Sequence, residues 1–191
     1  MADITQLAKA IAKLRPADKE RLFQLLADRG ELPARYLPQA IFGEQLALLS
    51  PSKQPSGLPD IVLVFDGGSR GNPGWGYGSY AIQRVSDGLQ RLERIDLGDG
   101  YTNNEAEYDT LIAALQDLIH RLEAAGRDPA EFALEVRGDS TLVLNQLEGT
   151  WKAKEPRMRQ RRDQCHRLLR RFGAVKLVAQ PREESVRVLG H

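Results

Sequence analysis

One short segment, residues 61–66, constrains the fold of this chain more than any other. Residues 61–65 form a continuous apolar run, rich in β-branched side chains, that ends on the carboxylate of Asp66. Such a run is typical of a strand buried on both faces. The stretch 67–74 is rich in glycine and turn-forming residues, which let a backbone approach a ligand closely. The segment predicts either a strand that ends at a ligand site or a hairpin turn that begins with aspartate.

Length and composition predict a soluble, cytoplasmic protein. With 191 residues and 41% hydrophobic content, the chain can form one ordinary core and a small appendage. No stretch has the roughly 20 apolar residues of a membrane span, so we expect no membrane partner. The N-terminus lacks the features of a secretion signal, and the single Cys165 excludes an internal disulfide.

Positive charge is concentrated in residues 151–171. This segment holds nine lysines and arginines against Glu155 and Asp163, a net charge of +7, whereas the rest of the chain sums to −6. A basic element of this kind favours a polyanionic partner, because neutralising phosphates releases counterions. A solvated helix face explains the same pattern equally well.

Three regions follow from the order of the patterns. Residues 1–49 carry apolar side chains at helical spacing and predict a small helical region, with a role in capping, self-association or binding a protein partner. Residues 50–59 hold three prolines and three serines, a composition typical of a linker. Residues 60–191 form the remaining domain.

That domain predicts an α/β fold. Strands expected at 78–85 and 89–97 would extend the first strand into an antiparallel meander, with a turn at 86–88. A helix over 103–123, a strand over 132–136, a helix over 141–147, the basic helix and a strand over 174–179 follow. The expected result is a mixed sheet flanked by helices.

Two more carboxylates occupy positions comparable to that of Asp66. Glu107 lies on the apolar stripe of its helix, four residues before Leu111, whereas Glu105 is expected to be exposed. Asp139 follows a strand and precedes a helix, and such turns gather ligand-binding groups. Glu107 could instead simply complement the helix dipole.

Three acids at one sheet edge repel one another unless a cation neutralises them. Oxygen ligands without nearby cysteine or histidine favour Mg²⁺ or Mn²⁺. Two such ions can activate a water and stabilise the leaving oxygen in phosphodiester cleavage.

Three motifs resemble those of the type 1 ribonuclease H family. They are the segments 66–74, 102–108 and 138–140, and the similarity extends over residues 60–191. The resemblance implies a ribonuclease H-like mixed five-stranded sheet and hydrolysis of the RNA strand of RNA/DNA hybrids. It also implies that Asp66, Glu107 and Asp139 are metal ligands.

The resemblance further assigns substrate contacts to nine residues. The RNA strand would meet Gly67, Gly68, Ser69, Arg70, Asn72, Asn103 and Asn104, and the DNA strand would meet Trp151 and Lys152. Contact with a 2′-hydroxyl is how a protein distinguishes RNA from DNA. Asparagine also suits turns and helix caps, and Trp151 could be a packing residue.

One departure concerns the fourth metal-site carboxylate of the family. After an exit loop like 182–184, the family pattern places an aspartate where this chain has Leu189, with Ser185 and Val188 at two other pattern positions. His191 could take the role of that acid. Alternatively, the chain is truncated, or it is a catalytically weak hybrid-binding module. A nuclease acting on DNA junctions fits the acids, but not the glycine loop and the Asn pair.

Overall fold

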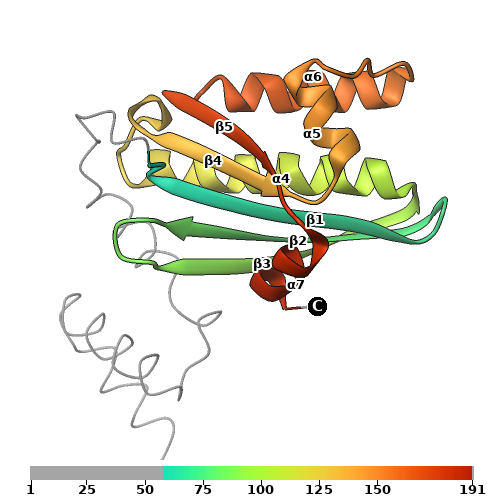
Figure 1. The fold of residues 1–191 in the computed structure, drawn as a ribbon, viewed down its shortest axis with the longest axis horizontal. Helices are drawn as coiled ribbons and strands as arrows, with labels where there is room; N and C mark the ends of the chain where they lie inside the picture. The colour runs from blue at the N-terminus through green and yellow to red at the C-terminus, as the bar shows by residue number, and fades with distance from the viewer. Residues whose placement is uncertain (1–57, 191) are drawn as a thin grey trace, which may run out of the picture. The chain divides into compact units, whose positions relative to one another are not determined.

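The computed structural model describes residues 58–190, which form a five-stranded mixed sheet covered by helices (Figure 1). The strand order is β3-β2-β1-β4-β5, with antiparallel pairing among the first three and parallel pairing of β4 with β1 and β5. The predicted antiparallel meander and the predicted mixed sheet are therefore confirmed. The strands are β1 (Ile61–Gly71), β2 (Gly74–Arg84), β3 (Gln90–Tyr101), β4 (Ala133–Gly138) and β5 (Ala174–Ala179).

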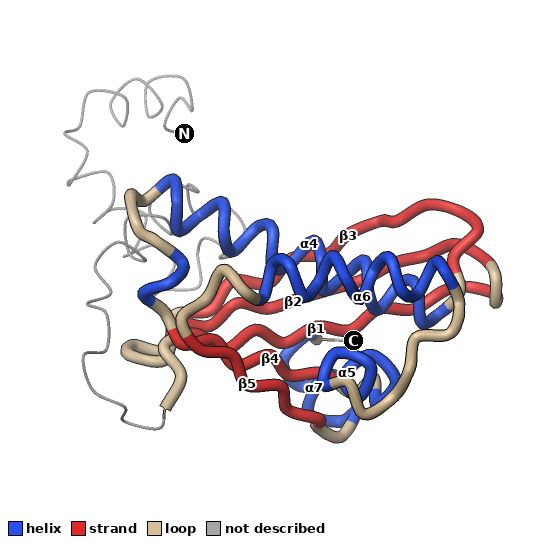
Figure 2. The backbone as a smooth tube through the Cα atoms, turned by 90° about the horizontal axis from the view of Figure 1, so that it is seen from above, coloured by secondary structure: helices blue, strands red, loops and turns tan. Residues whose placement is uncertain are grey.

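The helices of the described part are α4 (Asn103–Ala124), α5 (Thr141–Glu148), α6 (Pro156–Leu169) and α7 (Arg182–Leu189), with a 3₁₀ helix η2 (Pro129–Glu131). The predicted basic helix lies within the basic segment 151–171 and begins at Pro156, because proline suits the first helical position and its missing N–H is not needed there. In Figure 2, α4 and α6 run alongside one another above the sheet.

Alternation along β1 divides the core between the two faces of the sheet. Ile61, Leu63 and Phe65 face α4, whose leucines at 111, 115, 118 and 122 are all fully buried. This confirms the predicted apolar stripe of the helix. Each such leucine contributes about 1.5–3 kcal/mol relative to an exposed one.

The glycine-rich stretch is strand rather than loop. β1 continues to Gly71 and β2 begins at Gly74, so the expected loop 67–74 shrinks to a tight hairpin turn. A Cβ on Gly67 would lie 2.5 Å from the backbone oxygen of Ala106, and one on Gly78 would lie 1.9 Å from Oγ1 of Thr110. The glycines are therefore required because α4 crosses the hairpin closely.

The expectation that Glu105 is exposed is wrong. Thr102 caps α4 by accepting from the Glu105 backbone N–H, and the Glu105 carboxylate accepts from the Thr102 backbone N–H in return. This capping box leaves Glu105 only 4% exposed. The Thr-x-x-Glu spacing of residues 102–105 is a sequence signal for this arrangement.

Helix α7 replaces the exit loop that the motif resemblance suggested. Glu183 and Glu184 lie in its first turn and Arg187 in its last, which matches the helix dipole, and Gly190 ends it in a left-handed conformation. Leu189 is fully buried against Val62, Val64 and Ala81. Because these β1 positions alternate with those facing α4, α7 covers the other face of the sheet.

Among residues 58–190, no helix is long and apolar enough to cross a membrane. The predicted helical region 1–49 and the linker residues up to 57 lie outside the described residues, as does His191.

Candidate active site and nucleic-acid groove

The structure brings the three predicted acids to one edge of the sheet. Asp66 lies in β1 and is 6% exposed, Asp139 directly follows β4, and Glu107 comes from the second turn of α4. Burial, and to a smaller extent the charges of Asp139 and Asp66, raise the pKa of Glu107 from its ordinary 4.5 to about 7. The three carboxyl groups are therefore electrostatically coupled.

Two neighbouring side chains engage these acids. The Ser140 hydroxyl donates to Glu107 Oε2, and this hydrogen bond lowers the pKa of Glu107 against the effect of burial. Arg182 at the start of α7 places Nη1 3.7 Å from Asp139 Oδ2. As placed within the described residues, no three acidic, histidine or cysteine side chains stand close enough to hold a metal ion. Metal binding would require these side chains to turn toward a shared ion.

A groove of about 400 Å³ lies at the start of α4, the helix that carries Glu107, and at α5, the helix that follows Asp139 and Ser140. It is lined by the hairpin turn, the start of α4, helix α5 and the segment leading into α6, with the residues Asn72, Thr102, Asn103, Asn104, Leu142, Gln146, Lys152, Lys154, Glu155 and Met158. Four of the predicted substrate contacts, the three asparagines and Lys152, thus meet in one groove. The polar side chains and two lysines suit a sugar–phosphate backbone.

Gln146 and Lys154 are groove residues that sequence reasoning missed. Gln146 is 7% exposed, and its Oε1 accepts a hydrogen bond of 3.0 Å from Tyr108 Oη. This bond fixes the amide and leaves its NH₂ group as the available donor. The sequence signal for this side of the groove is the spacing of Leu142 and Gln146, which lie four residues apart and therefore on the same side of α5.

The two sides of the groove are connected by hydrogen bonds through the hairpin. Ser69 N donates to Asn103 Oδ1 at 2.8 Å, Asn103 N donates to Asn72 Oδ1 at 3.4 Å, and Ser69 Oγ donates to the Tyr101 carbonyl at 2.7 Å. Asn72 therefore accepts from the first N–H of α4 from outside the helix, whereas the N-cap of α4 is Thr102 and the Asn103 side chain binds the hairpin instead. Asn104 is exposed at the groove.

The remaining loop residues lie on both faces of the hairpin. Gly67 packs against α4, whereas a Cβ on Gly68 would lie 2.7 Å from Tyr77 Oη on the other face. Arg70 is exposed, with its Cζ 5.8 Å from the centroid of the Tyr77 ring. Gly68 and Arg70 are therefore not brought to the groove.

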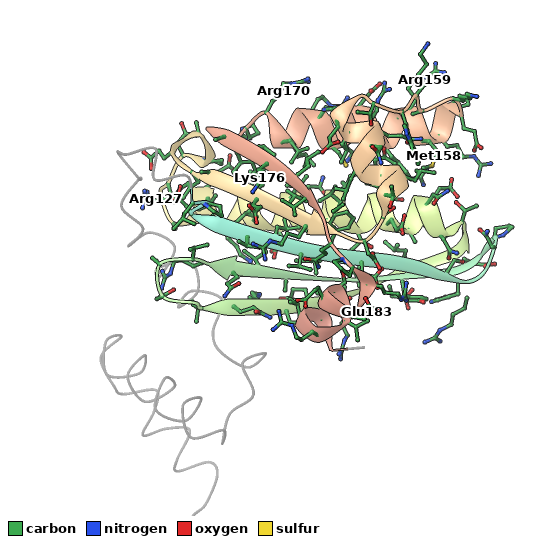
Figure 3. The ribbon with its side chains drawn as sticks, viewed as in Figure 1. Arg127, Met158, Arg159, Arg170, Lys176 and Glu183 are labelled. Carbon is green, nitrogen blue, oxygen red and sulfur yellow. The ribbon has the colours of Figure 1, made fainter. Side chains whose placement is uncertain are left out.

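Trp151 and Lys152 are exposed residues of the segment that precedes α6. Trp151 is 49% exposed, which excludes the alternative that it is a core residue. Beyond them, Arg159 and Arg170 lie near the two ends of α6, and Figure 3 shows both side chains directed away from the sheet. The apolar residues 158, 165, 168, 169 and 172 were expected to form the inner side of this segment; Met158, Cys165, Leu169 and Phe172 are buried, and Leu168 is half-buried.

Arg161 is a further residue that sequence reasoning missed. It makes two hydrogen bonds of 3.0 Å to Asp109, and its Nη1 lies 3.2 Å from Glu105 Oε1. Since Glu105 also closes the capping box of α4, Arg161 fixes the basic helix against the start of the helix that carries Glu107. Asp109 and Glu105 both lie on α4, so their bonds to Arg161 join α6 to α4.

Replacing Ser140 with alanine should raise the pKa of Glu107 further, because the hydrogen bond to the ionised carboxylate is lost. The same change removes the N-cap of α5 and should cost about 1 kcal/mol of stability. Carbon-detected NMR titration of the glutamate carboxyls would measure the first effect, and urea denaturation the second. Ser140→Thr keeps the hydroxyl and should leave both near wild type. A Glu107 titration unchanged in Ser140→Ala would show that the hydrogen bond is absent in solution.

Replacing Arg161 with glutamine should lower the free energy of unfolding by about 1–3 kcal/mol. The change leaves the carboxylate of Glu105 buried without its main cation, although the 21% exposure of Arg161 limits the cost. Arg161→Lys keeps the charge but not the paired hydrogen bonds to Asp109, so it should recover only part of the loss. Arg159→Gln, on the exposed side of the same helix, is the matched control for urea denaturation. Equal effects at positions 159 and 161 would contradict the role given to Arg161.

Comparison with known proteins shows which class of protein this chain belongs to. A family model described as reverse transcriptase-like matches residues 65–188. Ribonuclease HI of Halobacterium salinarum is 37% identical over 134 residues, which make up 70% of this chain and 63% of that protein. The chain thus spans less than two thirds of the length of this curated relative.

Two solved structures that resemble this chain belong to the same family. RNase H1 from Halobacterium salinarum NRC-1 is 36% identical with a TM-score of 0.58, over 67% of this chain and 90% of that one. LC11-RNase H1, solved in complex with an RNA/DNA hybrid, is 31% identical with a TM-score of 0.59, over 67% and 90% of the two chains. The chain belongs to the type 1 ribonuclease H family, as its three motifs predicted.

Proposed function

We propose that this protein hydrolyses the RNA strand of RNA/DNA hybrids endonucleolytically, leaving 3′-hydroxyl and 5′-phosphate ends. The observation that carries the proposal is the groove in which Asn72, Asn103 and Asn104 meet, at the start of the helix that carries Glu107. Ser140 connects the two sites, because it caps α5, which lines the groove, and also donates to Glu107. The LC11-RNase H1 complex supports a hybrid as the substrate.

The donor set fits a hard divalent cation. Asp66, Glu107 and Asp139 offer only carboxylate oxygens, and the pKa of Glu107 is raised mainly by burial and in part by the neighbouring charges of Asp139 and Asp66, which a bound cation would offset. These residues would hold Mg²⁺ or Mn²⁺, and we propose two ions. When bound, the ions activate a water for attack on the phosphodiester and stabilise the leaving oxygen.

The chain's own residues position the substrate. The asparagine amides would contact the RNA strand, including its 2′-hydroxyls, which DNA lacks. Lys152, Trp151 and the arginines of α6 would hold the DNA strand, mainly through its phosphates. Both strands must be in place for the acids to meet the correct phosphodiester.

A catalytically weak hybrid-binding module is the second candidate. It is favoured by Leu189, which is fully buried where the family pattern has an acid, and by Arg182, which lies beside Asp139. We propose that His191 supplies the missing ligand. If an imidazole replaces an oxygen ligand, we expect weaker use of Mg²⁺ and a preference for Mn²⁺.

The test is cleavage of a strand-labelled hybrid in Mg²⁺ and in Mn²⁺, beside single-stranded RNA, double-stranded RNA and duplex DNA. We expect cuts in the RNA strand of the hybrid alone. Asp66→Asn should lose at least about a hundredfold in rate, since even residues that only support metal ligands cost 10–100-fold. Asp99→Asn, an exposed acid of β3, is the matched control.

His191→Ala separates the two candidates further. A large fall in rate would place the histidine in the site, whereas an unchanged rate would mean that three acids suffice. Hybrid binding without cleavage in either metal would favour the binding module. Cleavage of duplex DNA would contradict both candidates. Cytoplasmic location and self-association through residues 1–49 stay predictions.

A further inference from the structure

The β1–β2 hairpin has a second functional surface, on the face opposite the groove. Gly67, Gly76 and Gly78 face inward, because a Cβ on each would meet Ala106, Tyr101 or Thr110. Their neighbours along each strand must therefore face outward. The outward-facing residues are Asp66, Gly68 and Arg70 of β1, with Trp75 opposite Arg70 and Tyr77 opposite Gly68 in β2.

Large side chains remain exposed on this face. Trp75 is 47% exposed and Tyr77 is 38% exposed, although aromatic side chains of this size usually bury most of their surface. The Tyr77 ring lies against Gly68, and the Arg70 guanidinium lies over it with Cζ 5.8 Å from the centroid. We call Arg70, Trp75 and Tyr77 the hairpin platform.

The platform lies next to the proposed catalytic site. Asp66 is four residues before Arg70 on the same face of β1, and the hairpin projects beyond the end of α4 in both views (Figures 1 and 2). The groove that would hold the paired hybrid opens on the other face of this hairpin, at Asn72 and Asn103. A strand that leaves the duplex at this point can pass from the groove to the platform.

We propose that the hairpin platform stacks unpaired bases of a single-stranded tail adjoining the hybrid. This inference rests on the proposed function, since it assumes that a hybrid occupies the groove. Bases inside a duplex stack on one another on both sides, so exposed aromatic rings cannot stack on them and instead stack on unpaired bases. The platform would thus direct the enzyme to junctions between hybrid and single strand.

The charges around the platform favour stacking over phosphate binding. Arg70 is its one cation, and Asp96 lies opposite Tyr77 in β3 with its carboxylate 3.0 Å from Gly98 N. The local charge therefore nearly cancels. The contribution of the tail to affinity should accordingly depend weakly on salt, unlike the contribution of the basic helix.

The two tryptophans of the chain, at 75 and 151, allow a direct test. In full-length Trp151→Phe, Trp75 is the only tryptophan and reports on the platform. Its fluorescence would be measured in EDTA with a blunt hybrid, with hybrids carrying a six-nucleotide RNA or DNA tail, and with a single-stranded oligonucleotide alone. We expect quenching by unpaired nucleotides and little quenching by the blunt hybrid.

Affinity measurements complete the test. Trp75→Ala should weaken binding of a tailed hybrid by about ten- to a hundredfold, the range expected for losing one stacked base, and change the blunt hybrid less than twofold. Val175→Ala, which shortens a side chain of β5 that is 37% exposed, is the control and should change neither. The RNA and DNA tails show which strand supplies the bases.

Two results would contradict the proposed role of the hairpin platform. One is equal quenching of Trp75 by blunt and tailed hybrids, and the other is an equal effect of Trp75→Ala on the affinities for blunt and tailed hybrids. Failure of the proposed function looks different. In that case wild-type protein leaves the blunt hybrid uncut with metal present, while Trp75 is still quenched by the single-stranded oligonucleotide. If the blunt hybrid is cut normally and no tail quenches Trp75, the proposed role of the hairpin platform is wrong and the proposed function stands.

Discussion

Replacing Leu189 with aspartate is expected to lower the free energy of unfolding by about 3–5 kcal/mol, although this change restores the acid of the family pattern. The side chain is fully buried against Val62, Val64 and Ala81. A carboxylate there would lose its hydration without a cation to compensate, and α7 would lose its main apolar contact with the sheet. Urea denaturation followed by circular dichroism would measure the loss.

Two further substitutions separate the causes. Leu189→Met keeps volume and apolarity and should cost less than about 1.5 kcal/mol. Leu189→Asn has the shape of aspartate without its charge, so the difference between the two polar variants measures the cost of the charge. A stable Leu189→Asp protein that cleaves hybrid faster than wild type would mean that position 189 faces the acids in solution.

The case of α7 indicates where sequence reasoning failed. The motif resemblance suggested an exit loop at 182–184, although Glu183 and Glu184 suit the first turn of a helix and Gly190 suits its end. The burial of Leu189 depends on which face of the sheet the segment meets, and this is a property of tertiary packing. No local pattern of residues 182–189 carries that information.

Strands and long helices were predictable because their signals are local. The apolar run 61–65, the stripe of leucines in α4 and the Asp87–Gly88 turn each depend on neighbours in sequence. The convergence of Asp66, Glu107 and Asp139 followed from strand order at one sheet edge. Gln146 and Arg161 were missed because their partners, Tyr108 and Asp109, are 38 and 52 residues distant in sequence.

Removing the charge of Glu107 with Glu107→Gln should stabilise the protein in the absence of divalent cations, increasingly so as the pH rises. The pKa of this carboxyl is about 7 in the folded protein and close to 4.5 when it is unfolded. Below pH 4.5 both states are protonated, and the wild type has no penalty. Between these values the unfolded state loses its proton first, so wild-type stability falls as the pH rises.

Above pH 7 the full penalty is reached, which we expect to be about 3 kcal/mol. The stability of Glu107→Gln minus that of wild type should therefore be near zero at pH 4.5 and largest at pH 8. Chemical denaturation in EDTA across this range measures the difference. Glu148→Gln, an exposed glutamate at the end of α5, is the control whose difference from wild type should stay flat.

Added Mg²⁺ or Mn²⁺ should make wild type more stable than Glu107→Gln, the opposite of the order expected in EDTA. A cation held by Asp66, Glu107 and Asp139 binds the folded state and favours the ionised carboxylate, so it should stabilise wild type more at pH 8 than at pH 6. Glu107→Gln should respond much less, because the amide is a weaker ligand and one negative charge is missing. If the difference in stability between Glu107→Gln and wild type changes with neither pH nor added metal, Glu107 is solvated like an ordinary surface glutamate. The acid cluster would then have no electrostatic reason to gather a cation.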